Sequence, residues 1–304
     1  MTRLRYATRK SALALAQSRM VMRLVCEARP GVTVEEVQVV TQGDRVVDRP
    51  LAEIGGKGLF VKEIEEALLD GRADVAVHSM KDLPADLAEG LVVGCVPERE
   101  SPYDLLVTVD GRSLDALAQG ARVGTSSRRR EVALRALRPD LEVRMLRGNV
   151  DTRVRKLREG EYDAIVLAEA GVRRLGVAVE AVRLEGVIVP AVAQGALALE
   201  TRAEDKATWE VVRVIHHLAT ERETEAERAV MRALGGSCTV PMGALARYEA
   251  GTERMTMEGF YAGDDGSLTA RATLEGSARD PDEARALGQK LAEMLRRRAD
   301  SARA

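Results

Sequence analysis

Apolar and polar residues follow two patterns along this chain, one typical of buried strands and one typical of helices. Short apolar runs indicate strands covered on both faces, and longer stretches with apolar residues every three or four positions indicate helices packed on a sheet. The strand-like runs lie at residues 34–40, 73–77, 91–96, 105–109, 163–167 and 196–200. Helix-like segments lie between them, for example at 11–28, where Ser11 can cap the first turn, and at 59–69. Strands that alternate with helices predict an α/β fold.

The α/β pattern occurs twice before it changes. Pro97, Pro102 and several charges interrupt it near residues 98–104, and a second α/β unit then continues until the chain crosses back near residue 195. After a helical stretch at 203–234, shorter alternating runs and a last helix at 281–298 indicate a small α+β unit. We therefore predict two α/β domains around a cleft and a small C-terminal domain. The predicted boundaries are residues 1–97 with 195–215, residues 98–194, and residues 216–304.

The densest group of charges lies at two predicted strand-to-helix turns. One runs from Gly124 to Arg130 (Gly-Thr-Ser-Ser-Arg-Arg-Arg) and the other from Leu146 to Arg153 (Leu-Arg-Gly-Asn-Val-Asp-Thr-Arg). Helix starts carry unpaired backbone N–H groups, and guanidinium groups bind carboxylates or phosphates through two parallel hydrogen bonds. Residues 122–158 hold eleven Arg and one Lys against four acids. The pattern predicts a site for a ligand with several negative charges, although arginines in mid-helix can equally be solvated.

Other polar residues also stand where predicted strands end. Lys81 and Asp82 follow a strand-like run, at the position where open α/β sheets bind ligands, although a Lys-Asp pair is also a common surface ion pair. Arg9 lies at the first strand-to-helix turn. The glycine-rich loop at 55–58, with Lys57 inside it, allows close approach of a ligand to the backbone, or is simply flexible.

The three cysteines have neither the number nor the spacing of a disulfide framework or a metal site. Cys26 and Cys95 lie in apolar segments, which predicts inert core thiols. Cys238 follows Gly235-Gly236-Ser237 in a loop, which makes it a candidate nucleophile or point of covalent attachment. No partner for a catalytic triad stands near it, and the three histidines form no metal-binding pattern, so we predict no metal.

Composition excludes some classes of protein. The net charge of −2 is not that of a general nucleic-acid binder, and 3% aromatic residues are too few for base-stacking surfaces. No apolar run has the length of a membrane span, and Arg19 and Arg23 interrupt the apolar stretch near the N-terminus. We therefore expect a cytoplasmic protein.

Six motifs and the cysteine loop together resemble the hydroxymethylbilane synthase family, also called porphobilinogen deaminase, over the whole chain. Each motif is weak alone, but their order and approximate spacing are specific. They are residues 7–11, 55–60, 78–82, 124–127, 146–150 and 193–196, followed by the loop of Cys238. The resemblance implies a monomer with two periplasmic-binding-protein-like (type II) α/β domains and a third, α+β domain. It also implies a transferase that joins four porphobilinogen molecules head to tail, with loss of ammonia, into the linear tetrapyrrole hydroxymethylbilane.

The resemblance also implies the site. A dipyrromethane cofactor would be joined to Cys238 by a thioether, and Asp82 would be the catalytic carboxylate. The remaining cofactor-binding residues would be Ser79, Lys81, Thr125, Ser127, Arg129, Arg130, Arg147, Gly148 and Asn149. The substrate-binding residues would be Arg9, Lys57, Phe60, Arg153, Arg174 and Gln194. Each pyrrole carries an acetate and a propionate, so a growing chain needs many cations.

Three departures from the family and one rival function remain. Glu53 stands where many relatives have lysine, Arg128 replaces a commonly apolar residue before the arginine pair, and the cysteine loop reads Gly-Gly-Ser-Cys rather than ending Gly-Gly-Cys. The rival is a non-catalytic anion-binding module of the periplasmic type, or the effector domain of a regulator. It explains two α/β domains and many arginines, but neither Cys238 nor the third domain.

Overall fold

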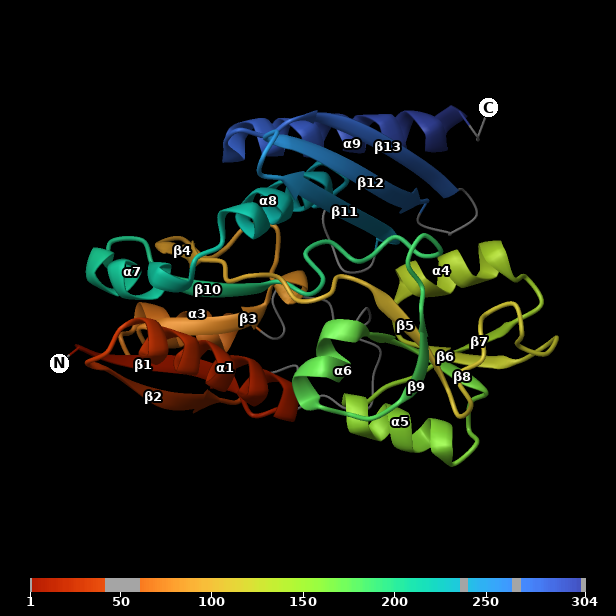
Figure 1. Ribbon diagram of the computed structural model, residues 1–304, viewed down its shortest axis with the longest axis horizontal. Helices are drawn as coiled ribbons and strands as arrows, with labels where there is room; N and C mark the ends of the chain where they lie inside the picture. The colour runs from red at the N-terminus through yellow and green to blue at the C-terminus, as the bar shows by residue number, and fades with distance from the viewer. Residues whose placement is uncertain (1, 42–60, 236–239, 264–268, 302–304) are drawn as a thin grey trace. The chain divides into compact units, whose positions relative to one another are not determined.

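The computed structural model describes residues 2–41, 61–235, 240–263 and 269–301, and the chain forms two compact units (Figure 1). Unit 1 contains Met1–Glu100 and Ala196–Arg222, and unit 2 contains Ser101–Gly195 and Glu223–Ala304. Each unit is therefore built from two separate segments of the sequence.

Unit 1 is a five-stranded sheet with helices on both faces, in the strand order β2-β1-β3-β10-β4. Its strands are β1 (Thr2–Arg9), β2 (Val32–Val39), β3 (Val75–Ser79), β4 (Leu91–Cys95) and β10 (Leu197–Arg202), and its main helices are α1 (Ala12–Ala28), α3 (Lys62–Leu69) and α7 (Lys206–Val212). β1 is parallel to β2 and β3, and β10 is antiparallel to β3 and β4. Successive residues of a strand face opposite sides. Tyr6 accordingly packs with α1 and α7, and Ala7 with α3.

The α/β part of unit 2 repeats this topology, in the strand order β7-β6-β8-β5-β9. Its strands are β5 (Asp104–Thr108), β6 (Arg122–Thr125), β7 (Glu142–Met145), β8 (Ala164–Ala168) and β9 (Glu180–Arg183), and its helices are α4 (Arg128–Leu137), α5 (Val150–Arg158) and α6 (Glu169–Leu175). β6 is parallel to β7 and β8, and β5 is antiparallel to β8 and β9. Thus β5 occupies the same position in this sheet that β10 occupies in the sheet of unit 1.

The C-terminal part of unit 2 is an antiparallel sheet covered by a helix. The sheet consists of β11 (Met242–Glu249), β12 (Arg254–Ala262) and β13 (Thr269–Ser277). The helices are α9 (Pro281–Ser301) and α8 (Leu218–Ala233), of which the residues from Glu223 onward belong to unit 2. Glycines bring α9 close to its neighbours: a Cβ on Gly259 would lie 2.7 Å from Leu295, and one on Gly288 would lie 2.0 Å from the carbonyl oxygen of Ala226 in α8.

These elements confirm the predicted fold class, a periplasmic-binding-protein-like α/β arrangement with a small α+β part. The prediction of three domains with the boundaries given above stays a prediction.

One expected element is wrong: the helical stretch at 203–234 is broken between α7 and α8. His216 is extended there, its Nδ1 accepts a hydrogen bond from the N–H of Val96, and the N–H of His217 donates to the carbonyl of Val96. These tertiary bonds outweigh local helix propensity. The strand β9 was not predicted.

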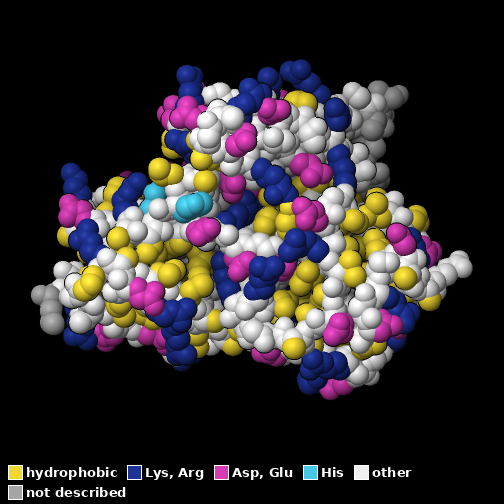
Figure 2. Space-filling view, in the orientation of Figure 1, with side chains coloured by type: hydrophobic (Ala, Val, Ile, Leu, Met, Phe, Trp, Pro, Cys, Tyr) yellow, Lys and Arg dark blue, Asp and Glu magenta, His cyan; other side chains and the backbone are white. Residues whose placement is uncertain are grey.

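Acidic and basic side chains are interspersed on the face of the molecule that Figure 2 shows. Many charged side chains form short-range pairs, such as Arg155 with Glu159 and Arg135 with Glu131. Within the part of the chain that the structure describes, no helix is both long and apolar enough to cross a membrane.

Candidate active site

In unit 1, the predicted catalytic residue Asp82 lies on a short, well-anchored turn. β3 ends at Ser79 and a 3₁₀ turn, Met80–Asp82, follows directly. Met80 and Leu83 are buried on either side of the pair Lys81-Asp82, and the N–H of Met80 donates to the carbonyl of Ala196 at 3.0 Å. Asp82 itself is exposed. The backbone is therefore fixed while the carboxylate is accessible to a ligand.

Two more predicted residues share this edge of the first sheet. Arg9 ends β1 and Ser79 ends β3, and because these neighbouring strands are parallel, their carboxyl ends meet at one edge. The hydroxyl of Ser79 is held by Gln17 of α1, whose Nε2 lies 2.8 Å from it. Gln17 is buried, and the sequence analysis did not single it out.

In unit 2, the two cationic turns are helix starts, as predicted. Ser127 is the N-cap of α4, with its hydroxyl accepting from the N–H of Arg130, and its own N–H donates to the hydroxyl of Thr125. Asn149 is the N-cap residue of α5 and makes no side-chain capping bond. The strands that lead into these turns, β6 and β7, are parallel neighbours, so both helix starts lie at the same edge of the sheet. Their unpaired N–H groups favour a bound anion there.

Gly148 allows the second turn to close. Its φ is 108°, and a Cβ at this position would lie 2.8 Å from the side chain of Thr152. Arg153 reaches back over the turn, and its Nε donates to the carbonyl of Gly148 at 2.7 Å. The glycine therefore fixes where Arg153 stands.

Arg129 and Arg130 are buried and bind one buried carboxylate, Asp104, at the start of β5. Asp104 is 0% exposed; Arg129 Nη2 lies 2.8 Å from its Oδ2, and Arg130 Nη2 lies 2.7 Å from its Oδ1. Burial opposes ionisation of Asp104, but the charges of the two arginines outweigh it and hold the pKa of this carboxyl below its usual range. Asp104 was not predicted. A single acid that opens an apolar strand in an arginine-rich unit is the signal that could have found it.

The guanidinium of Arg129 retains capacity for a ligand. Its Nη1 donates to the carbonyl of Val189 at 2.6 Å, but its Nε, buried as well, has no hydrogen-bond partner. A buried N–H without a partner is costly, so an incoming carboxylate would be favoured there.

Arg130, Arg147 and Arg153 form a cluster of like charges. Burial, and then the charges of Arg130 and Arg147, lower the pKa of Arg153 to about 10. Asp104 binds Arg130 of this cluster together with Arg129. The closeness of three like charges favours a ligand that brings several negative charges.

Arg174 and Gln194 complete the predicted set in unit 2. Arg174 is half-buried and its Nη2 donates to the carbonyl of Gly195 at 2.7 Å. Gln194 is buried, and its Nε2 donates to Asp104 Oδ1 and to the carbonyl of Pro102, each at 2.8 Å. Gln194 therefore belongs to the same buried group as Arg129 and Arg130.

Some residues named in the sequence analysis lie outside the described residues. They are Glu53, Lys57, Phe60 and Cys238, together with the rest of the glycine-rich loop at 55–58 and with Gly236 and Ser237.

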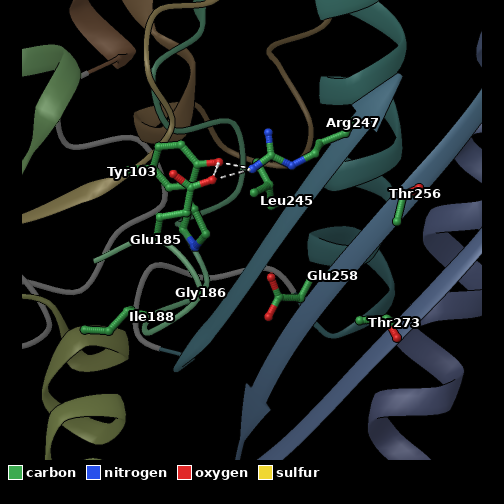
Figure 3. A pocket seen from close by; sticks show the side chains of 10 residues that line it. Tyr103, Glu185, Gly186, Ile188, Leu245, Arg247, Thr256, Glu258 and Thr273 are labelled. Atoms are coloured by element: carbon green, nitrogen blue, oxygen red, sulfur yellow. Dashed lines mark hydrogen bonds and ion pairs between the residues drawn. The ribbon is translucent and has the colours of Figure 1, made fainter. Parts of the chain in front are cut away.

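A separate cavity of about 270 Å³ lies in unit 2 (Figure 3). The hydroxyl of Tyr103 donates to Glu185 at 2.6 Å and also contacts Arg247 on β11, and Glu258 on β12 faces the same space. None of the predicted site residues that the structure describes lines this cavity.

The two sheets of one topology and the cationic helix starts of unit 2 define an α/β protein with a cationic edge suited to a ligand that carries several negative charges. Comparisons with known proteins are more specific. The family model described as porphobilinogen deaminase, dipyromethane cofactor binding domain, matches residues 4–210, and that of the porphobilinogen deaminase C-terminal domain matches residues 222–297. The chain belongs to the porphobilinogen deaminase family.

Relatives match the chain over nearly its full length. The chain is 50% identical to porphobilinogen deaminase of Nitratidesulfovibrio vulgaris (strain Miyazaki F), over 97% of this chain and 94% of the relative. It is also 50% identical to porphobilinogen deaminase of Sorangium cellulosum, over 89% of this chain and 90% of the relative. Among solved structures, the sulphonate-binding protein SsuA of Escherichia coli is similar at 18% identity with a TM-score of 0.38, covering 77% of this chain and 70% of that one. The family match favours the enzyme over the binding-module reading.

Proposed function

We propose that this chain is a hydroxymethylbilane synthase. It joins four porphobilinogen molecules head to tail, releases ammonia at each addition, and builds the linear tetrapyrrole on a dipyrromethane primer. The observation that carries this proposal is the match of both family models, which together extend from residue 4 to residue 297. The reaction belongs to tetrapyrrole biosynthesis.

The described residues suit a dipyrromethane with its carboxylate side chains. Its attachment to Cys238 is part of the proposal. The unpartnered Nε of Arg129 and the clustered charges of Arg130, Arg147 and Arg153 are complementary to acetate and propionate groups. In unit 2, Thr125, Ser127, Gly148 and Asn149 would contribute backbone and hydroxyl donors at the two helix starts. When bound, the dipyrromethane supplies the pyrrole carbon to which the first substrate unit is joined.

Asp82 is proposed as the catalytic residue, and its turn suits that role. Loss of ammonia leaves positive charge on the pyrrole system, and a carboxylate that accepts a hydrogen bond from the pyrrole N–H stabilises that charge as it develops. Such stabilisation needs a group that does not have to reorganise. The buried anchors Met80 and Leu83 hold the Asp82 backbone in this way.

Other residues of the proposal bind carboxylates of the substrate or of the growing chain. In unit 1 these are Arg9 and Lys81, together with Ser79 as a polar contact, and Lys57 and Phe60 are assigned by their motif alone. In unit 2, Arg153, Arg174 and Gln194 have this role. The proposal keeps the division into three domains predicted above. The family resemblance further implies a cytoplasmic monomer that acts on porphobilinogen without a nucleic-acid or membrane partner.

Intact mass of the purified chain tests the proposal. We expect the mass of the bare chain plus two pyrrole units, and we expect Cys238→Ser to lack the addition while Cys26→Ser and Cys95→Ser retain it. A wild-type protein with the bare mass and no turnover of porphobilinogen would favour a binding module. An unchanged adduct on Cys238→Ser would overturn the assignment of that cysteine.

A further inference from the structure

The carboxylate of Glu227 on α8 is completely buried and serves two backbone N–H groups. Its exposed fraction is 0%. One oxygen, Oε2, accepts a hydrogen bond from the N–H of Ala193 at 2.6 Å, and the other, Oε1, accepts one from the N–H of Ala246 in β11 at 2.8 Å. Glu227 thus ties α8 both to the C-terminal sheet and to the segment that carries Gln194.

Ala193 has a backbone conformation that it would rarely adopt alone. Its φ is 56°, in the left-handed region, and it is one of two non-glycine residues with positive φ in the described ranges. A residue with a Cβ is strained in this region and stays there only when its surroundings hold it. The short hydrogen bond from the Ala193 N–H to Glu227 is such a restraint. The Ala193 side chain is buried as well, so the backbone has little room to relax.

The conformation of Ala193 determines where Gln194 points. From the next position in the chain, Gln194 donates to Asp104, and Asp104 binds Arg129 and Arg130 on its two oxygens. Every member of this series from Glu227 to the two arginines is buried. A shift of the Ala193 peptide would therefore move the amide of Gln194 away from Asp104 and release the carboxylate that orients both guanidinium groups.

We propose that Glu227 is a positioning residue for the reaction: by holding Ala193, it keeps Gln194 on Asp104 and so orients Arg129 and Arg130 toward the carboxylates of the cofactor. The inference rests on the proposed function of these two arginines. In the sequence, Glu227 can be found as an acidic residue on the apolar face of α8, three positions before Val230. α8 ends at Ala233, five residues before Cys238 in the sequence, so the same helix leads into the cofactor loop.

The helix itself offers a matched control. Glu223 lies one turn before Glu227 on α8 and also accepts a backbone hydrogen bond from β11, from the N–H of Tyr248 at 3.1 Å. The bond from the Ala193 N–H goes to Glu227. Glu223→Gln therefore disturbs the packing of α8 on β11 one helical turn away from that bond.

The test compares Glu227→Gln with Glu223→Gln. Glutamine keeps the shape, but its NH₂ group cannot accept the second N–H. We expect Glu227→Gln to lower the fraction of chains that carry the cofactor, measured by intact mass, and to raise KM for porphobilinogen by about 10- to 100-fold. Glu223→Gln should change neither. Equal losses in the two variants, or normal cofactor loading and KM in Glu227→Gln, would overturn the proposal. The function of the wild-type protein is tested separately, by its own cofactor adduct and its turnover of porphobilinogen.

A double-mutant cycle asks whether Glu227 acts through Gln194. If it does, Glu227→Gln combined with Gln194→Leu should lose little more than the worse single variant, because both break the same series of contacts. Fully additive losses would mean that Glu227 acts by another route and would contradict the proposal. Should Glu227→Gln fail to fold, Glu227→Asp takes its place with the same expectation, since it keeps the buried charge but is too short to reach both N–H groups.

Discussion

At the residue scale, the chemistry depends on the positions of a few polar side chains. The sequence predicted where these side chains lie in the strands and helices better than it predicted which residues they contact. It placed Asp82 after a strand and Arg129 and Arg130 at a helix start, and the structure has them there. Spacing and capping signals are local, so a sequence shows them directly. Asp104 and Glu227 were missed because their roles depend on contacts made across the fold, at sequence separations of 26 and 34 residues.

Replacement of Asp82 by asparagine tests the proposed catalytic role. Asp82→Asn keeps the shape of the side chain and removes its charge, so the variant should carry cofactor and bind porphobilinogen while turnover falls by about 10²–10³. Steady-state assay of the cofactor-loaded variant measures this. If Asp82 were only a surface partner of Lys81, the change would cost at most about 1 kcal/mol of stability and turnover would stay near normal.

Cys95 provides a test of the other cysteine assignments. Burial raises the pKa of its thiol to about 12, so it is protonated at neutral pH and unreactive. Iodoacetamide at pH 8 should leave Cys95 unmodified in the folded protein and label it after unfolding in urea. Peptide mass analysis of the two samples measures the labelling of Cys95. Rapid labelling in the native protein would show that Cys95 is accessible to the reagent and contradict the assignment.

At the scale of elements, the sequence predicted most strands and helices, and its errors have physical causes. Strand-like runs at 163–167 and 105–109 correspond to β8 and β5, displaced by one residue. β9 was missed because Glu180–Arg183 is short, half polar and pairs along one side only, with β5. The break between α7 and α8 was missed because its cause, the backbone of Val96, is remote in sequence.

The ion pair between Arg122 and Asp163 joins the beginnings of β6 and β8 and should give a pH-dependent stability. Hydrogen bonds from the side chain and then the backbone of Arg122 lower the pKa of Asp163 to about 2. A lowered carboxyl pKa stabilises the fold above the unfolded value of about 4, and this stabilisation is lost as the pH falls toward 2.

Asp163→Asn should remove this contribution. Because Asp163 is 44% exposed, we expect a loss of less than about 1 kcal/mol at pH 7 and a smaller fall in stability between pH 4 and pH 2 than in the wild type. Urea unfolding at a series of pH values measures both. An unchanged pH profile would show that the pair contributes nothing to folding.

The packing of α9 on α8 makes a second prediction at this scale. Alanine normally favours a helix over glycine, but a Cβ on Gly288 would lie 2.0 Å from the carbonyl oxygen of Ala226. Gly288→Ala should therefore destabilise the protein by about 1–3 kcal/mol, since the helices must move apart. Gly251→Ala is the control, because a Cβ there meets nothing within 4 Å. Equal thermal unfolding of the two variants would contradict the close approach of the helices.

At the scale of the whole molecule, a nearly neutral chain concentrates positive charge in one place. The net charge is −2, and acidic and basic side chains are interspersed on the face that Figure 2 shows. The cluster of Arg130, Arg147 and Arg153 departs from this balance: burial, and then the charges of Arg130 and Arg147, lower the pKa of Arg153 to about 10. Like charges brought together in this way favour a ligand that brings negative charge, and we propose that the carboxylates of the cofactor and the growing chain bind here.

The last prediction separates the arginines of this cluster from arginines of the surface. A charged hydrogen bond to a carboxylate contributes about 1.5–3 kcal/mol, so Arg147→Leu should markedly reduce cofactor assembly or stop elongation with partly built chains. Arg135→Leu is the control, since Arg135 is 55% exposed and pairs with Glu131 on its own helix. Intact mass shows the loading and the length of any stalled chain, and steady-state assay shows turnover. If both variants loaded and turned over alike, position at a helix start would carry no information about function, and the site would have to be sought elsewhere in the fold.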